Sequence, residues 1–223
     1  MKKIGMIVAM DKELKDYFEK LGGVIPVEDS VYNVWQAQAY GKQLYIIKSG
    51  VGEISAAGAT QYLITKYGVD IIINFGICGK ISENLKLLDT VVLNSVVYYQ
   101  FDCSEIDNVL PGVYMGNSYY IDTDKELVSK LLSLDSTLKG AICASGDKFI
   151  GNKQDKDYLL NTFKADVCEM ESAGILITCL RNGVKCLLIK SVSDDCDGMD
   201  FRTYCSLAAQ KYVEIVDKFV KEY

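Results

Sequence analysis

The stretch DIIINFGICG, residues 70–79, decides the fold that we expect for this chain. The strand expected at residues 70–74 has an apolar centre of three isoleucines without polar alternation, and such runs are typical of strands that helices cover on both faces. The second half, Gly76-Ile77-Cys78-Gly79, predicts a glycine-rich turn at the carboxyl end of that strand. A buried strand followed by a turn of this kind indicates an α/β protein.

Apolar runs alternate with helix-period segments along the whole chain. Only two prolines and no Ser/Gly-rich run interrupt this order, so we expect a single domain over residues 1–223. Continuous apolar strands separated by helices predict a largely parallel or mixed sheet with helices on both faces. We expect strands at 4–9, 34–39, 43–48, 70–74, 90–98, 141–144, 166–169 and 185–192, and helices at 11–21, 53–66, 124–134 (with Thr123 as N-cap), 153–163, 171–180 and 203–221.

The composition argues against several classes of protein. The net charge of -6 argues against nucleic acid as a partner, because phosphate binding needs clustered Lys and Arg. The apolar run Ile4–Met10 is too short for a signal peptide, and no stretch is long enough to span a membrane. The chain has no histidine, and its eight cysteines include no CxxC pair, so no zinc site is expected. We expect reduced thiols in a cytoplasmic protein.

Glycines and carboxylates follow most of the expected strands. In α/β sheets, ligands bind beyond the carboxyl ends of the strands, so these residues mark a candidate site. Their convergence is a stronger signal than any one of them. The segments, in chain order, are Met10 to Glu13, Ser49-Gly50-Val51-Gly52, Gly76-Ile77-Cys78-Gly79, Ser145-Gly146-Asp147, Met170-Glu171 and Ser193-Asp194.

Two of these segments also have simple structural interpretations. Ser49-Gly50-Val51-Gly52 could bind an anion through its backbone, but it lacks the lysine and hydroxyl of a Walker loop. Taken alone, it is better explained as a tight turn. Glu13 opens a helix, where the helix dipole favours an acidic residue in any case.

Two acidic segments point more directly to chemistry. Glu169-Met170-Glu171 starts a helix, yet a carboxylate beside a thioether suits a sugar site, because one carboxylate accepts from two neighbouring hydroxyls. Residues 193–197, Ser-Asp-Asp-Cys-Asp, could form a solvated loop. Repulsion among these acids would instead raise at least one pKa, as a general acid requires.

In this order the segments resemble the nucleoside phosphorylase/nucleosidase superfamily, and within it the methylthioadenosine/S-adenosylhomocysteine nucleosidases. The resemblance runs nearly end to end. It implies a nucleoside phosphorylase-like, three-layer α/β/α fold with a mixed, twisted central sheet, and a homodimer in which Phe101 or its neighbours complete the partner's pocket. The motifs that carry it are AMDKE (9–13), SGVG (49–52), GICG (76–79), SGDKFI (145–150), EME (169–171) and SD with Asp197 (193–197).

The resemblance implies hydrolysis of the N-glycosidic bond of a purine nucleoside, with nucleoside and water as partners and no metal or cofactor. Asp194, steadied by Ser193, would protonate N7 of the purine. Glu171 would hold the ribose hydroxyls, and Glu13 would deprotonate the attacking water. The remaining substrate-binding residues would be Met170 beneath the sugar, Phe149 and Ile150 at the base, Met10, Val51 and Phe201 around the 5′ substituent, and Ile77, Cys78, Gly79 and Glu169 from the same motifs.

The attacking group and the catalytic role have alternatives. Phosphorylases of this fold hold phosphate with several arginines, whereas this chain has only Arg181 and Arg202, so water is favoured. Lys48 and Lys80 could add charge, but a lysine lacks the bidentate fork of arginine. A phosphate-dependent purine nucleoside phosphorylase is therefore the first alternative. A non-catalytic nucleoside-binding protein is the second, although a pure binder does not need Asp194 together with Glu13.

Two positions depart from the family pattern. Ile77 stands where nucleosidases often carry a serine, so one hydroxyl near the water or sugar is lost. Lys190 replaces a common arginine, which we interpret as a minor change. The sequence leaves the preferred 5′ substituent open.

Overall fold

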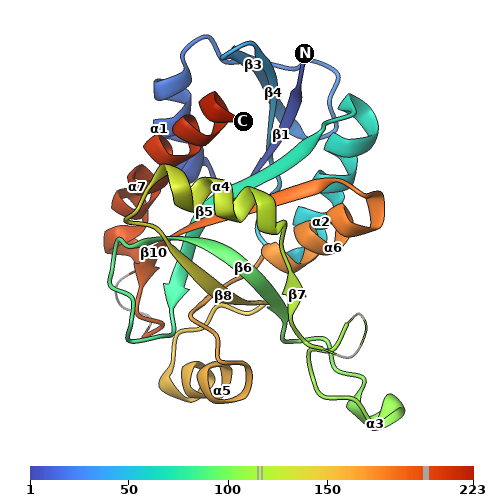
Figure 1. Cartoon of the computed structure of the whole chain (residues 1–223), viewed down its shortest axis with the longest axis vertical. Helices are drawn as coiled ribbons and strands as arrows, with labels where there is room; N and C mark the ends of the chain where they lie inside the picture. Colours follow the sequence, from blue (N-terminus) through green and yellow to red (C-terminus); the bar gives the residue numbers. More distant parts are fainter. Residues whose placement is uncertain (115, 117, 198–200) are drawn as a thin grey trace.

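The computed structural model describes residues 1–114, 116, 118–197 and 201–223, and over these residues ten strands form one sheet (Figure 1). The strand order is β10-β6-β8-β9-β5-β1-β4-β3-β2; β7 pairs with β6, and β10 also pairs with β5. The strands are β1 (Lys3–Val8), β2 (Ile25–Pro26), β3 (Asn33–Ala39), β4 (Lys42–Lys48), β5 (Ile71–Lys80), β6 (Thr90–Tyr98), β7 (Ile121–Asp122), β8 (Lys139–Ser145), β9 (Val167–Glu169) and β10 (Lys185–Asp194).

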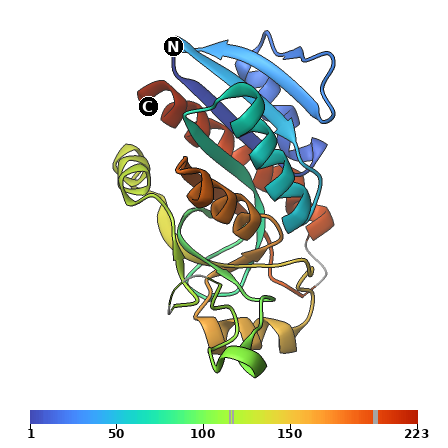
Figure 2. The ribbon, with the colours of Figure 1, turned by 90° about the vertical axis from the view of Figure 1, so that its right-hand side faces the viewer.

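Helices cover both faces of the sheet, as the sequence predicts. One face carries α1 (Asp11–Leu21), α4 (Lys125–Leu134) and α7 (Phe201–Glu222). The other carries α2 (Glu53–Tyr62) and α6 (Ser172–Asn182), which lie side by side in Figure 2. Two further helices, α3 (Ser104–Asp107) and α5 (Lys153–Phe163), lie at the end of the molecule where β6 and β8 finish (Figure 1). The predicted mixed, three-layer α/β/α fold is confirmed.

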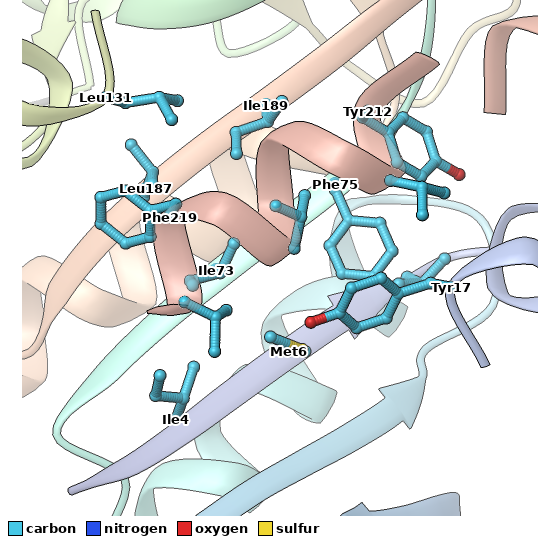
Figure 3. Packing of buried hydrophobic residues seen from close by; sticks show 14 of the residues in the cluster. Ile4, Met6, Tyr17, Ile73, Phe75, Leu131, Leu187, Ile189, Tyr212 and Phe219 are labelled. Carbon is cyan, nitrogen blue, oxygen red and sulfur yellow. The ribbon is translucent and has the colours of Figure 1, made fainter. Parts of the chain in front are cut away.

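The apolar runs of the sequence are strands buried on both faces. In β5, Ile73 and Phe75 pack under α1 and α7, whereas Ile72 points to the layer of α2 and α6. The Phe75 ring lies 5.1 Å from the rings of both Tyr17 and Tyr212 (Figure 3). Full burial of a large apolar side chain stabilises the fold by about 1.5–3 kcal/mol. The two apolar faces of β5 therefore anchor it between the helix layers.

The strand directions bring the candidate residues to one edge of the sheet. Strand β1 runs parallel to β4 and β5, and β5 runs parallel to β10, so the carboxyl ends of these four strands lie together. Strand β9 runs antiparallel to β5 and pairs only with its end, at Gly79 and Lys80. The residues after β9 therefore meet those after β1, β4 and β10.

The predicted turn at Gly76–Gly79 is wrong, because β5 continues through it to Lys80. The strand continues because β10 pairs with it along this length, with Lys190 opposite Gly76 and Asp194 opposite Gly79. The two glycines do not turn the chain. They leave room for other side chains to approach the strand closely.

Smaller differences concern helix starts and extra elements. Asp124, not Thr123, caps α4: its carboxylate accepts a hydrogen bond from the N–H of Leu127 at 3.0 Å, and the Thr123 hydroxyl donates to the carbonyl of Leu93. The helix expected at 53–66 has two parts: α2 ends at Tyr62, and a π-helical turn, Leu63–Tyr67, follows it. The sequence did not predict β2, β7 or α3. Within the described ranges, no helix is long and apolar enough to cross a membrane.

Candidate active site

A cavity of about 150 Å³ opens at the edge where β1, β5 and β10 end. It brings together nearly all the predicted site residues, although they come from seven separate segments. Ile150 is the exception: it lines a small adjoining cavity together with Phe149, Met170 and Asp194. The predicted residues that line the main cavity are Met10, Glu13, Val51, Ile77, Cys78, Gly79, Phe149, Glu169, Met170, Glu171, Ser193, Asp194 and Phe201.

Glu13 reaches the cavity from the first turn of α1. Its carboxylate accepts hydrogen bonds from the N–H of Met10 at 2.9 Å and the N–H of Ile77 at 3.0 Å. The first of these caps α1, so the structural interpretation of this residue also holds. A Cβ at position 76 would lie 2.7 Å from Oε1 of Glu13, so Gly76 admits the carboxylate. Burial raises the pKa of Glu13 against the opposing effects of Lys190 and the N–H donors, which suits a group that takes a proton from water.

Glu169, which lines the cavity, forms a buried ion pair with Lys190. Lys190 Nζ lies 2.8 Å from Glu169 Oε2, and neither side chain is more than 3% exposed. Glu169 also accepts hydrogen bonds from the N–H and hydroxyl of Ser172. Burial alone would raise the pKa of Glu169, but Lys190 and these donors hold it below its usual value. Glu169 is thus an anion whose oxygens are largely engaged by the protein.

Glu171 has fewer hydrogen-bond partners than Glu169. It is the N-cap residue of α6, and its Oε1 accepts a hydrogen bond from the N–H of Gly52 at 3.1 Å. Burial, and then the negative charge of Glu169, raise its pKa to about 7. An ionised Glu171 has free lone pairs with which to accept from two vicinal hydroxyls.

Asp194 ends β10 and is 2% exposed. Its carboxylate accepts from the Ser193 hydroxyl at 2.7 Å and from the N–H of Cys196 at 3.0 Å. Burial raises its pKa; these two donors lower it, and Asp197 and Asp195 add to the increase. The sequence predicts a raised pKa through the neighbouring acids, whereas burial is the main cause. A buried acid with a raised pKa can hold a proton for transfer.

Apolar and aromatic side chains complete the cavity. The rings of Phe149 and Phe201 meet edge to face at a centroid distance of 5.4 Å, and Phe149 is 48% exposed. An exposed ring beside a buried acid is a suitable surface for stacking a planar heterocycle. Val51, which is 50% exposed, lies with Met10 at the open side.

Two buried titratable side chains next to the site were not predicted from the sequence. Lys190, interpreted from sequence as a minor replacement, is a buried cation among Glu169, Glu171 and Glu13, which together raise its pKa although burial opposes this. Glu53 lies behind Glu171, buried against Ser145 and the start of α6. The SGD motif could have pointed to Glu53 in the sequence, because its Ser145 contacts the Glu53 side chain.

Other cations near the site are already paired. Lys48 lies 2.8 Å from Asp11, and Lys80 lies 2.7 Å from Asp195. Neither arginine is among the described residues that line the cavity. The described part of the chain also contains no group of three or more His, Cys, Asp or Glu side chains that could hold a metal ion.

This fold and this set of carboxylates define a class of protein. The phosphorylase superfamily model matches residues 3–221, and the chain belongs to that superfamily. The resemblance inferred from the motifs is thereby confirmed.

Particular relatives are nucleosidases. The chain is 28% identical over 232 residues to the aminodeoxyfutalosine nucleosidase of Helicobacter pylori strain J99, covering all of both chains. It is 26% identical over 228 residues to the 5′-methylthioadenosine/S-adenosylhomocysteine nucleosidase of Staphylococcus saprophyticus, covering 98% of this chain and 99% of the relative. The predicted enzyme class, an N-glycosyl hydrolase, is confirmed at this level.

A solved structure of the H. pylori 5′-methylthioadenosine/S-adenosylhomocysteine nucleosidase with butyl-thio-DADMe-Immucillin-A superposes on the chain with a TM-score of 0.93. Its sequence identity is 27%, and the match covers 100% of this chain and 99% of that one. A futalosine hydrolase mutant from H. pylori gives a TM-score of 0.94 at 26% identity, with full coverage of both chains. Nucleosidases named for different substrates thus occur among similar proteins.

Proposed function

We propose that this protein hydrolyses the N-glycosidic bond of a purine nucleoside with a 5′ substituent, such as 5′-methylthioadenosine or S-adenosylhomocysteine. The observation that carries the proposal is one cavity that combines the buried acid Asp194, the carboxylates Glu13 and Glu171, and the exposed ring of Phe149. An acid, a base and a stacking surface are the parts that glycoside cleavage with a purine leaving group requires.

In the proposed reaction, Asp194 protonates N7 of the base, which makes the purine a better leaving group. General acid help of this kind contributes roughly 10²–10⁴-fold. The sugar then acquires oxocarbenium character, and the carboxylates in the wall stabilise its positive charge. Glu171 holds the ribose hydroxyls, with Met170 beneath the sugar, and Glu13 takes a proton from the attacking water.

The charge of the cavity supports water as the nucleophile. Lys190 is buried and bound to Glu169, and Lys48 and Lys80 are paired with Asp11 and Asp195. Among the described residues that line the cavity there is no lysine or arginine, so phosphate would have to enter beside several carboxylates, and like charges at short range are unfavourable. A phosphate-dependent phosphorylase is the less favoured alternative on this ground.

A product assay decides between these two reactions. The protein is incubated with 5′-methylthioadenosine in phosphate-free buffer and again with added phosphate, and the sugar product is identified by chromatography. We expect the same rate in both buffers and a free ribose derivative as the product. A rate that requires phosphate and yields a ribose 1-phosphate derivative would exclude hydrolysis.

Aminodeoxyfutalosine is a second candidate substrate, because nucleosidases named for it are among the similar proteins. The 5′ end of the pocket, formed by Met10, Val51 and Phe201, is apolar and partly open, which favours an apolar 5′ group that extends outward. A panel of adenosine, 5′-methylthioadenosine, S-adenosylhomocysteine and aminodeoxyfutalosine, compared by kcat/KM, ranks these substrates. We expect unsubstituted adenosine to be the poorest of them.

We also propose a homodimer. Ile54 is 85% exposed and lies beside a groove lined by Ala57, Tyr98 and Ile177, and an exposed apolar surface of this kind favours burial against a partner. Phe101, which was expected at this contact, packs against Tyr98 at a ring distance of 6.1 Å. Light scattering after size exclusion should give twice the chain mass, and Ile54→Lys should lower it towards the monomer.

The proposed location is the cytoplasm. All eight cysteines are free thiols, and seven of them are buried. Free thiols persist in a reducing compartment. Cell fractionation followed by immunodetection tests this location.

A further inference from the structure

Glu53 is a buried carboxyl group that the proposed reaction does not use. It is the first residue of α2, directly after the SGVG turn, and is 4% exposed. Its Oε1 lies 2.5 Å from the Ser145 hydroxyl oxygen, and its Oε2 accepts from the N–H of Gly174 at 2.6 Å. The side chain therefore joins the start of α2 to the end of β8 and the start of α6.

Glu53 lacks the cation that a buried carboxylate needs. Among the described residues it forms no ion pair, while the nearby Lys190 is bound to Glu169. Glu169 and Glu171 place further negative charge close to it. A buried ion without a partner is strongly unfavourable, so the neutral acid is the stable form. Burial, and then the charge of Glu169, raise the pKa of Glu53 to about 8.

The hydrogen bonds of Ser145 are consistent with a proton on Glu53. The Ser145 hydroxyl oxygen accepts from the N–H of Ala173 at 3.0 Å, and Ser145 also hydrogen-bonds Glu169, which helps to lower the pKa of that carboxylate. A hydroxyl has one proton to donate. When Glu53 is ionised, Ser145 donates to it, and this lowers the pKa of Glu53. A proton on Glu53 lets the hydroxyl donate to the anion Glu169 instead, while Glu53 donates across the short contact.

We propose that Glu53 is a positioning residue: as a neutral acid it fastens α2 to α6 and thereby holds Glu171 at the ribose site. The link is short, because the N–H of Gly52, the residue before Glu53, donates to Glu171 Oε1. Gly174, which donates to Glu53, lies three residues after Glu171 on the same helix start. For its kinetic part, this inference rests on the proposed function.

Ionisation of Glu53 would weaken this arrangement. The charged and titratable groups that face it are Glu169 and Glu171 before α6, Asp147 after β8, Tyr98 and Tyr99 at the end of β6, and Lys190 on β10. Most of them are acidic. A second charge next to Glu169 repels Glu171 from its place and removes the proton shared with Ser145.

The first test compares Glu53→Gln and Glu53→Ala in a nucleosidase assay at pH 7, with Glu126→Gln as a matched control. Glu126 is also an acid in the first turn of a helix, but its side chain is 82% exposed. Glutamine keeps a donor for Ser145 and an acceptor for Gly174, so we expect wild-type KM and kcat. We expect Glu53→Ala to raise KM about tenfold or more with a smaller change in kcat, because misplacement of a binding group by about 1 Å has effects of this size.

The pH profile adds a readout that a merely structural role would not change. In the wild type, KM should rise above about pH 8, where Glu53 ionises. The Glu53→Gln variant should lack this rise. A Glu53→Gln variant as impaired at pH 7 as Glu53→Ala would overturn the neutral-acid proposal, and a folded Glu53→Ala variant with wild-type KM would overturn the positioning role.

Thermal unfolding tests the proton without any substrate. A carboxyl whose pKa is raised on folding contributes stability at low pH, and this contribution is lost as pH rises from the unfolded value of about 4.5 through the folded value of about 8. The melting temperature of the wild type should therefore fall more between pH 5 and pH 9 than that of Glu53→Gln. Equal falls would overturn the assigned protonation. If the wild type shows no nucleosidase activity, the proposed function fails, whereas the melting comparison still decides the state of Glu53.

Discussion

The two halves of β5 are equally buried but have opposite surroundings. In the first half Ile71, Ile72, Ile73 and Phe75 pack against apolar side chains of both helix layers. In the second half, a Cβ at Gly76 would lie 2.7 Å from Glu13 Oε1. A Cβ at Gly79 would lie 2.5 Å from Cys196 Sγ and 3.1 Å from Asp194 Oδ1. The first half supplies large apolar side chains to the core. In the second half Ile77 and Cys78 still reach the core clusters, but Gly76 and Gly79 leave room for functional groups to enter.

This difference separates stability from chemistry along a single strand. The amino half, with Phe75 between two tyrosine rings, fixes the position of the strand. The carboxyl half offers backbone, such as the N–H of Ile77 that binds Glu13. Substitutions in the first half should therefore change unfolding, and those around the second half should change kinetics.

The largest effect is expected from Asp194→Asn, which removes the proposed acid beside the end of β5. Asparagine has the same shape but no acidic proton, so kcat should fall by roughly 10²–10⁴-fold. Binding should persist, because the cavity wall is unchanged. Steady-state kinetics and calorimetric titration with a substrate analogue measure these two quantities. Wild-type turnover in this variant would contradict the role of Asp194, and a wild-type protein that binds but never turns over would support the alternative of a non-catalytic binder.

Ile73→Ala tests the apolar half. Ile73 is fully buried under α7, and removing its branched side chain leaves a cavity. Such substitutions cost about 2–5 kcal/mol of unfolding free energy. Urea unfolding measures the loss, and KM and kcat of the folded fraction should stay near wild type. A large kinetic change without loss of stability would show that the two halves are not separable in this way.

Gly76→Ala tests the polar half by adding one methyl group. Its Cβ would displace Glu13, and the proposed base for water would lose its alignment. We expect kcat to fall about 10–100-fold, in line with the cost of displacing a catalytic group by about 1 Å.

Gly5→Ala on β1 is the matched control for Gly76→Ala. A Cβ there would lie 2.7 Å from Cδ1 of Ile72, in the apolar region. Overpacking of a core costs about 1–3 kcal/mol, so this variant should lose stability and keep its kinetics. If both glycine variants lost activity equally at equal stability, the special role of Gly76 would be excluded.

The sequence was sufficient to predict the apolar half of β5, but it predicted the polar half only in part. A run of isoleucines buried on two faces leaves a local pattern that predicts a strand. Glycines that admit Glu13 and Asp194 have the same composition as a turn, and only pairing with β10 shows that the strand continues. Glu53 was missed for a similar reason: it resembles any acid at a helix start, and its partners Ser145 and Gly174 lie 92 and 121 residues away in sequence.

The smallest effect is expected from Asp195→Asn, one residue beyond the proposed acid. Burial would raise the pKa of Asp195, but Lys80 at 2.7 Å and Lys156 at 3.5 Å lower it overall. Its side chain is 35% exposed, so water screens these pairs and their loss should cost only about 0.2–1 kcal/mol.

Because the pKa of Asp195 is lowered on folding, this contribution is present at neutral pH and is lost as pH falls through the folded value. Melting curves at about pH 7 and pH 3 should therefore differ slightly less in the variant than in the wild type, while kcat stays within about threefold, since Asp195 contributes least among the causes that shift the pKa of Asp194. A loss of kcat as large as that of Asp194→Asn would mean that the acid function belongs to the pair and not to the buried member alone.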